Sequence, residues 1–349
     1  MSKASMRPAL EALEEKACAS IRYRVRRDIL GESPDVSDYI DGILSDRRVR
    51  CVLDWQHEDG FFGEVFHGGW IPQEKRKFSA TGAESCLRFL AEMGLPRTFP
   101  AIRRGLSVLL GDNWNRGASA WNTYAPEIGL WGDDYLRATI FSYYGAEDED
   151  FVEAEALRAL AVLESAARIE DFGAITETYR GKRYYIKGAA LPEIYHLRLL
   201  AFTTRWRTNE AIDAAARAVE HLIALSPLPI VYVKRRSQLI SPARIYPGDL
   251  GKSPGDFGGK DWFPWLHTTE LFARMGIVRR APSLRHQVEE LKGLLDAGGV
   301  PMITKPDERG FRKWSVYTGL ALEEDWKGAK WKYDLAFRSL LILKNAGML

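Results

Sequence analysis

Leu90 to Arg104 reads LAEMGLPRTFPAIRR, and Phe272 to His286 reads FARMGIVRRAPSLRH. The two stretches align without a gap and share six residues at equal positions, among them Gly94 and Gly276. Each has the pattern of a helix end, a glycine stop and the start of a second helix. Repetition of this kind predicts a chain built from helical hairpins.

Similar stops recur along the whole chain, at intervals long enough for one helical hairpin each. They fall at Gly31, Gly94, Gly145, about Arg205, Gly276 and Gly347. The helices that lead into the last five stops are expected at 78–94, 133–145, 189–204, 262–276 and 333–347. A second helix is expected after each of the first five, at 36–56, 99–113, 151–169, 208–226 and 283–297. This alternation predicts a closed or curved array of helix pairs.

The composition is that of an ordinary globular protein with a sizeable core, at 46% hydrophobic and 28% charged residues over 349 positions. The net charge of +2 is too balanced to indicate a polyanionic partner, which argues against nucleic acid. The N-terminus lacks the apolar core of a secretion signal, and no apolar run is long enough to span a membrane. Cys18, Cys51 and Cys86 include no CxxC pair, so we expect no disulfide framework and predict a reducing, cytoplasmic location.

One short motif points to a known family. Residues 56–63 read QHEDGFFG, which resembles the Q-x-x-D-G-x-W element of the terpenoid-cyclase and protein-prenyltransferase superfamily, with Phe62 in the place of Trp. In that family the Gln and Asp tie the end of an outer helix to its neighbour, so the resemblance implies structural roles for Gln56 and Asp59. It also implies an α/α toroid, in which inner helices surround a central cavity. The chain lacks the acidic and zinc-binding motifs of the catalytic members, so the resemblance leaves the chemistry open.

We therefore predict an all-α fold, an α/α toroid of about five to six helical hairpins that forms a single domain over residues 1–349. Residues 227–260 interrupt the repeat and are expected to form an inserted loop or lid. The first part of this insertion, 230–245, has the pattern of a short β-hairpin.

In a toroid the inner helices begin at one mouth of the cavity, and polar side chains there are the default site hypothesis. Histidine side chains ordinarily titrate near neutral pH and can donate or accept a proton, and adjacent acids can work as a coupled pair. The predicted catalytic residues are Asp133, Asp134, His196, His267 and Asp334. The predicted substrate-binding residues are Arg137, Tyr195, Trp262, Trp265, Tyr333 and Arg338. The structural alternatives are hydrogen-bonded core histidines, helix caps and a salt bridge between Asp334 and Arg338.

Two functional interpretations follow from this sequence. In the first, the cavity binds an isoprenoid or an oligosaccharide, because aromatic walls attract carbocations and stack on sugars. In the second, the protein is a noncatalytic helical scaffold that binds a protein or nucleic acid on a basic rim. That rim comprises Arg22, Arg26, Arg235, Arg236 and Arg244. No cofactor is expected, and no metal, because His57 and His67 lack the spacing of known metal motifs.

Overall fold

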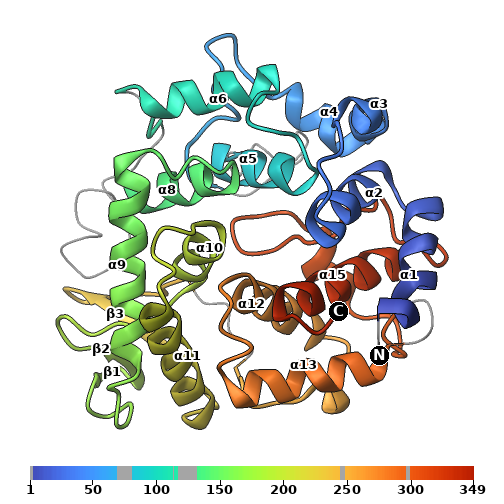
Figure 1. Cartoon of the computed structure of the whole chain (residues 1–349). Helices are drawn as coiled ribbons and strands as arrows, with labels where there is room; N and C mark the ends of the chain where they lie inside the picture. The colour runs from blue at the N-terminus through green and yellow to red at the C-terminus, as the bar shows by residue number, and fades with distance from the viewer. Residues whose placement is uncertain (1–2, 69–80, 113, 117–131, 244–247, 296–298) are drawn as a thin grey trace. The chain divides into compact units, whose positions relative to one another are not determined.

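The computed structural model describes residues 3–68, 81–112, 114–116, 132–243, 248–295 and 299–349 (Figure 1). The chain divides into two compact units. Unit 1 comprises Met1–Ala118, Phe257–Glu270 and Val288–Leu349, and unit 2 comprises Ser119–Asp256 and Leu271–Gln287. Both units contain helices, and the described β-strands all belong to unit 2.

Unit 1 is built around α15, which contacts α1 and α2 and is buried along most of its length. Its apolar residues recur on every side of the helix, as expected of a helix at the centre of a core. In chain order the described helices of unit 1 are α1 (Lys3–Lys16), α2 (Ala19–Arg24), a π-helical turn (Val25–Leu30), α3 (Ser37–Ser45), α4 (Arg47–Leu53), α5 (Ala83–Glu92), α6 (Pro100–Leu110), the first part of α12 (Trp262–Arg274), the last part of α13 (Pro282–Leu294), α14 (Glu308–Arg312) and α15 (Trp331–Ala346).

Unit 2 combines four helices that pack on one another with a small sheet. Its helices are α8 (Asp133–Tyr143), α9 (Asp150–Ala166), α10 (Ile194–Phe202) and α11 (Asn209–Ala224), together with a 3-10 turn (Pro254–Asp256) and the remaining parts of α12 and α13. Its strands are β1 (Thr176–Tyr179), β2 (Lys182–Tyr185), β3 (Val231–Arg235) and β4 (Gln238–Ile240).

The predicted positions of the helices are confirmed. The five helices expected before the stops correspond to α5, α8, α10, α12 and α15, and the five expected after them correspond to α3 with α4, α6, α9, α11 and α13. The glycine stops also behave as expected. Gly94 and Gly276 have φ angles of 97° and 79°, in the left-handed region that glycine adopts without strain at a helix end.

The prediction of an all-α toroid is wrong, because unit 2 contains a four-stranded mixed sheet and only about 53% of the chain is helical. The strand order is β1-β2-β3-β4, with antiparallel pairs at both edges and a parallel pair, β2 and β3, between them. The predicted hairpin at 230–245 is present as β3 and β4. The hairpin of β1 and β2 was not anticipated, and its pairing with β3 turns an isolated hairpin into a sheet. The lid role of residues 227–260 and the single-domain organisation stay predictions.

The sheet has one buried face. Val231 and Val233 are buried, and Tyr185 packs against a cluster of five buried apolar residues, namely Ala166, Ile169, Leu191, Leu222 and Leu250. Since successive side chains of a strand point to opposite faces, the other face of the sheet points away from this core.

Gln56 and Asp59 form hydrogen bonds that fix the backbone around them. The Gln56 amide donates to the carbonyl oxygens of Gly60 and of Ala101 in α6, both at 2.8 Å. The Asp59 carboxylate accepts the backbone N–H of Phe61 at 3.0 Å. The motif therefore joins the segment after α4 to α6 within unit 1. Among the described residues, no helix is long and apolar enough to cross a membrane.

Candidate functional site

Five of the predicted site residues belong to unit 2, on α8 and near the start of α10. The ring of Tyr135 lies 5.2 Å from that of His196, so the beginnings of these two helices are adjacent. Asp133, Tyr195 and His196 are buried. Asp134 is exposed and forms an ion pair with Arg137 at 3.0 Å.

His196 completes the N-terminal cap of α10. Its Nδ1 accepts the backbone N–H of Glu193 at 2.9 Å, while the Glu193 side chain accepts the backbone N–H of His196. This reciprocal capping satisfies two helix-terminal donors and requires the unprotonated Nδ1. Burial, together with a smaller contribution from the charge of Arg158, lowers the pKa of His196 to about 4. His196 is therefore neutral near pH 7 and serves as a cap; its catalytic role stays a prediction.

The other six predicted residues belong to unit 1. Trp262 and Trp265 are both 2% exposed and pack edge-to-face with each other and with Phe257, at ring distances of 5.1 to 6.2 Å. His267 is also buried, and its ring lies 5.6 Å from that of Phe263. Edge-to-face packing of this kind stabilises a core. These residues contribute to the aromatic core of unit 1, and no described pocket is lined by them.

Asp334 anchors the segment that precedes α15. Its carboxylate accepts the backbone N–H of Leu322 at 2.6 Å and the indole N–H of Trp326 at 2.7 Å. Burial raises the pKa of Asp334 to about 6, although these two hydrogen bonds oppose the rise. The neighbouring Glu323 accepts the backbone N–H of Cys18 at 2.8 Å, and burial raises its pKa to about 7. Asp334 therefore fastens residues 322–326 to α15, and Glu323 fastens the same segment to the start of α2.

Arg338 belongs to a buried ion-pair network within unit 1. Its guanidinium contacts Glu270 and Glu92, both at 2.9 Å, and Arg24 joins Glu92 at 2.6 Å. The expected salt bridge between Asp334 and Arg338 is replaced by these longer-range pairs. Because removing one partner leaves an uncompensated buried charge, the network strongly favours one arrangement of the helices that carry it. Tyr333, one turn earlier on α15, is half-buried.

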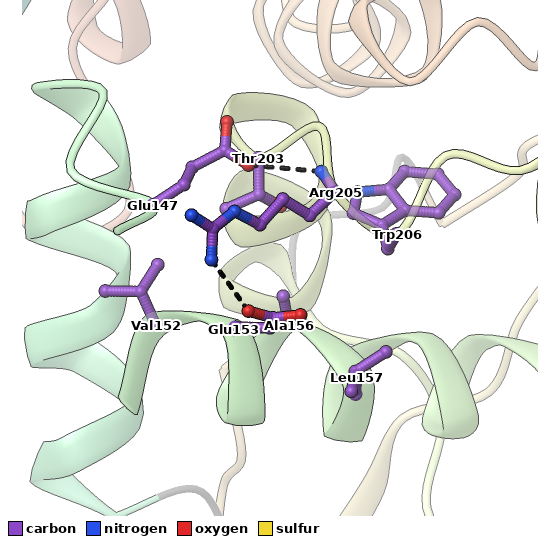
Figure 2. A pocket seen from close by; sticks show the side chains of 8 residues that line it. All are labelled: Glu147, Val152, Glu153, Ala156, Leu157, Thr203, Arg205 and Trp206. Atoms are coloured by element: carbon purple, nitrogen blue, oxygen red, sulfur yellow. Dashed lines mark hydrogen bonds and ion pairs between the residues drawn. The ribbon is translucent and has the colours of Figure 1, made fainter. Parts of the chain in front are cut away.

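A pocket lies in unit 2 where the end of α10 meets the start of α9 (Figure 2). It holds about 290 Å³ of space, part of it open to solvent. Eight side chains line it, and they are Glu147, Val152, Glu153, Ala156, Leu157, Thr203, Arg205 and Trp206. Val152 and Ala156 are buried and Leu157 is 53% exposed, so these three α9 residues form an apolar wall.

The polar side of this pocket is one cation between two acids. Arg205 donates to Glu153 at 2.8 Å, and the Glu147 carboxylate accepts the backbone N–H groups of Thr204 and Arg205 at 2.6 and 3.1 Å (Figure 2). Trp206 is held in place by a 3.0 Å hydrogen bond from its indole N–H to the carbonyl of Leu200. Hydrogen-bond donors, acceptors and an aromatic side chain thus surround one depression.

None of the eight residues that line this pocket is among the site residues predicted from the sequence. Glu147 begins an acidic run, EDED, that has the pattern of a solvated loop, and no predicted site residue lines the pocket. One signal was present: at this stop alone the repeat's glycine is replaced, by the sequence TTRW of residues 203–206. Among the described residues, no group of three His, Cys, Asp or Glu side chains could hold a metal ion. No protein-family model, no curated protein and no solved structure matches this chain.

Proposed function

We propose that this protein binds a small, uncharged polyhydroxylated ligand, with one side of a sugar ring resting on the open pocket between α9 and α10. The observation that supports this proposal is the combination of the Arg205–Glu153 pair with an apolar wall and Trp206 in one depression. Sugars are recognised by this combination, because their hydroxyl groups both donate and accept hydrogen bonds while their ring faces are apolar.

The charge of the pocket favours a sugar over an isoprenoid diphosphate. Glu147 and Glu153 outnumber the single cation Arg205, so the lining carries a net negative charge. A diphosphate would meet two carboxylates at close range, which costs binding energy. The apolar wall of three short α9 side chains is also too small for an isoprenoid chain.

A ligand can open the Arg205–Glu153 pair at small cost. The two side chains are 51% and 47% exposed. Ion pairs this exposed are worth about 0 to 1 kcal/mol. Glu147, by contrast, holds the backbone of residues 204–205, so the shape of the pocket persists when Arg205 turns toward a ligand.

The expected affinity is weak. At about −0.3 kcal/mol per non-hydrogen atom, a sugar of about twelve such atoms gains about −4 kcal/mol, which corresponds to a Kd of about 1 mM. The ligand is expected to meet the protein in a reducing, cytoplasmic setting, because Cys18, Cys51 and Cys86 form no disulfide.

Saturation-transfer NMR tests this proposal with a panel of mono- and disaccharides and with geranyl diphosphate. We expect transfer to at least one sugar, loss of that transfer in Arg205→Gln, and none to the diphosphate. Arg217→Gln, which removes an exposed arginine of α11 in the same unit, is the matched control. Equal transfer in Arg205→Gln and wild type, or transfer to the diphosphate alone, would contradict the proposal.

A further inference from the structure

The five arginines of the predicted basic rim do not form one set of cations that are all available to bind an anion. Arg26 of unit 1 forms ion pairs with Glu14 at 2.9 Å and Glu32 at 3.5 Å, and Arg244 lies outside the described residues. Arg235 and Arg236, in contrast, belong to the β3–β4 hairpin of unit 2. The positive charge whose role remains to be explained therefore lies on the sheet of unit 2.

Strand register brings three tyrosines and two lysines to one face of this sheet. Tyr179 is paired with Lys182 across β1 and β2, and Tyr184 is paired with Tyr232 across β2 and β3. Paired residues share a face, and so do residues two apart in a strand, which adds Lys234. By the same rule Glu177, paired with Tyr184, and Leu239, paired with Lys234, also lie on this face. We call Tyr179, Lys182, Tyr184, Tyr232 and Lys234 the tyrosine face.

The tyrosine face is the outer face of the sheet. Val231 and Val233 alternate with Tyr232 and Lys234 in β3 and are buried on the opposite side. The three tyrosines and Lys234 are half-buried, and Lys182 is exposed. Rings that are packed on a sheet but still partly exposed have little conformational freedom left to lose on binding.

The lysines of this face lie over its rings. The Lys234 ammonium is 4.4 Å from the ring centre of Tyr179 and 4.7 Å from that of Tyr184, and the Lys182 ammonium is 4.9 Å from that of Tyr232. No ion pair among the described residues includes either lysine. Their charge is held in place by aromatic rings and stays available to an anion.

Both hairpin turns add an arginine at a position that usually selects glycine or asparagine. Arg180 and Arg236 have φ angles of 50° and 53°. A non-glycine residue in this conformation costs about 1 kcal/mol or more. Residues 176–185 and 231–240 together carry six lysines or arginines and one acid, Glu177, which accepts a hydrogen bond from the Tyr184 hydroxyl. The net charge of the two hairpins is strongly positive although that of the whole chain is only +2.

We infer that the tyrosine face binds single-stranded nucleic acid, with bases stacked on its tyrosines and phosphates held by its lysines and by the turn arginines. Single strands are bound in this way because every base has a stacking face and every nucleotide a negative charge. Rings and cations are neighbours on this face at Tyr179 with Lys182 and at Tyr232 with Lys234, whereas Tyr184 lies between Tyr232 and Glu177. Readout of this kind is tolerant of sequence.

Other anionic partners use only part of this surface. An acidic peptide would pair with the cations but would not use the tyrosine rings for stacking. A duplex hides its base faces. An anionic membrane is bound through several inserted aliphatic or tryptophan side chains, and this face of the four strands offers only the half-buried Leu239 beside Lys234. Single-stranded nucleic acid is the partner that uses both components.

Fluorescence anisotropy with labelled oligo(dT) and oligo(U) of about twelve nucleotides tests the inference. If about four phosphates are contacted, the logarithm of the binding constant should fall with the logarithm of salt concentration with a slope of about −3. Lys182→Gln with Lys234→Gln should weaken binding at least about tenfold and make that slope shallower by about 1.4. Arg168→Gln with Arg217→Gln removes the same charge from exposed positions of unit 2 off the sheet and is expected to change binding less than about twofold.

A second pair of variants separates stacking from charge. Tyr179→Leu should weaken binding about tenfold, whereas Tyr179→Phe keeps the ring and should bind as wild type does. Circular dichroism confirms that each variant is folded. Equal weakening by the sheet and control double variants would overturn the inference, as would equal competition by polyglutamate, a DNA duplex or phosphatidylserine vesicles. The sugar experiment concerns different residues, so either proposal can fail alone.

Discussion

The pair of buried acids at the start of α15 makes the stability of unit 1 depend on pH, and Glu323→Gln is the perturbation that isolates this dependence. Glu323 is 4% exposed and accepts the Cys18 backbone N–H. A glutamine offers a carbonyl oxygen to the same donor but does not ionise. Asp334, Arg48 and Lys330 are the charged groups that act on Glu323, and all three are kept in the variant.

The magnitude follows from the pKa. Burial raises the pKa of Glu323 from 4.5 to about 7, the charge of Asp334 adds to the rise, and the Cys18 hydrogen bond opposes it. A difference of about 2.5 in pKa corresponds to about 3 kcal/mol. Since the folded protein favours the neutral acid, this stabilisation is complete below about pH 4.5 and is lost as the pH rises through about 7. The wild type therefore loses about 2 to 3 kcal/mol between pH 5 and pH 8 through this one group.

Urea denaturation at pH 5 and pH 8, followed by tryptophan fluorescence and circular dichroism, measures the effect. We expect the free energy of unfolding of Glu323→Gln to exceed that of the wild type by about 2 to 3 kcal/mol more at pH 8 than at pH 5. Any packing change that the glutamine introduces is the same at both pH values and cancels in this difference.

The matched control is Glu324→Gln, which removes the same charge from the next position, where the side chain is 41% exposed and pairs with Arg47 at 3.6 Å. Exposed pairs are worth less than about 1 kcal/mol, so the control should show almost no difference between the two pH values. If Glu323→Gln and Glu324→Gln respond equally to pH, Glu323 is not the group that couples ionisation to folding and the reasoning fails.

Two further predictions concern a backbone turn and a helix cap. Gly63→Ala should destabilise unit 1 by about 2 kcal/mol or more in urea denaturation, because φ is 69° and the new Cβ would clash with the Thr81 carbonyl oxygen. Gly31→Ala has a similar φ of 72° but open space around it, so about 1 kcal/mol is expected, and equal costs would disprove the clash. The His196 imidazole, with its pKa lowered to about 4, should show constant NMR shifts from pH 8 to pH 5.5, and a midpoint near 6.5 would show that it does not cap α10 while buried.

The helices could be predicted from the sequence because their ends are marked by local signals. A glycine in the left-handed conformation is favoured wherever a helix must stop, and Gly94 and Gly276 serve that purpose regardless of the surroundings. The hairpin of β1 and β2 was missed because its turn is Arg180–Gly181, whereas Asn-Gly is the pattern that identifies such turns. The pairing of β2 with β3 joins segments about 50 residues apart, and no local pattern specifies it.

The candidate site could not be predicted from the sequence because the residue types that catalyse reactions or bind ligands also stabilise the folded structure. An aspartate in the first turn of a helix, such as Asp334, is chemically suited both to proton transfer and to holding backbone N–H groups. Only the distances decide between these roles: its acceptor positions are taken by Leu322 and Trp326, and it is 1% exposed. Arg205 shows the opposite case. It has an unremarkable sequence context, yet α9 and α10 place it between two acids with half of its side chain in solvent, where a ligand can reach it. A charged residue is therefore a better functional candidate when the fold leaves it partly exposed beside partners that it can exchange at small cost. It is a poorer candidate when it is buried and its hydrogen-bonding positions are already occupied.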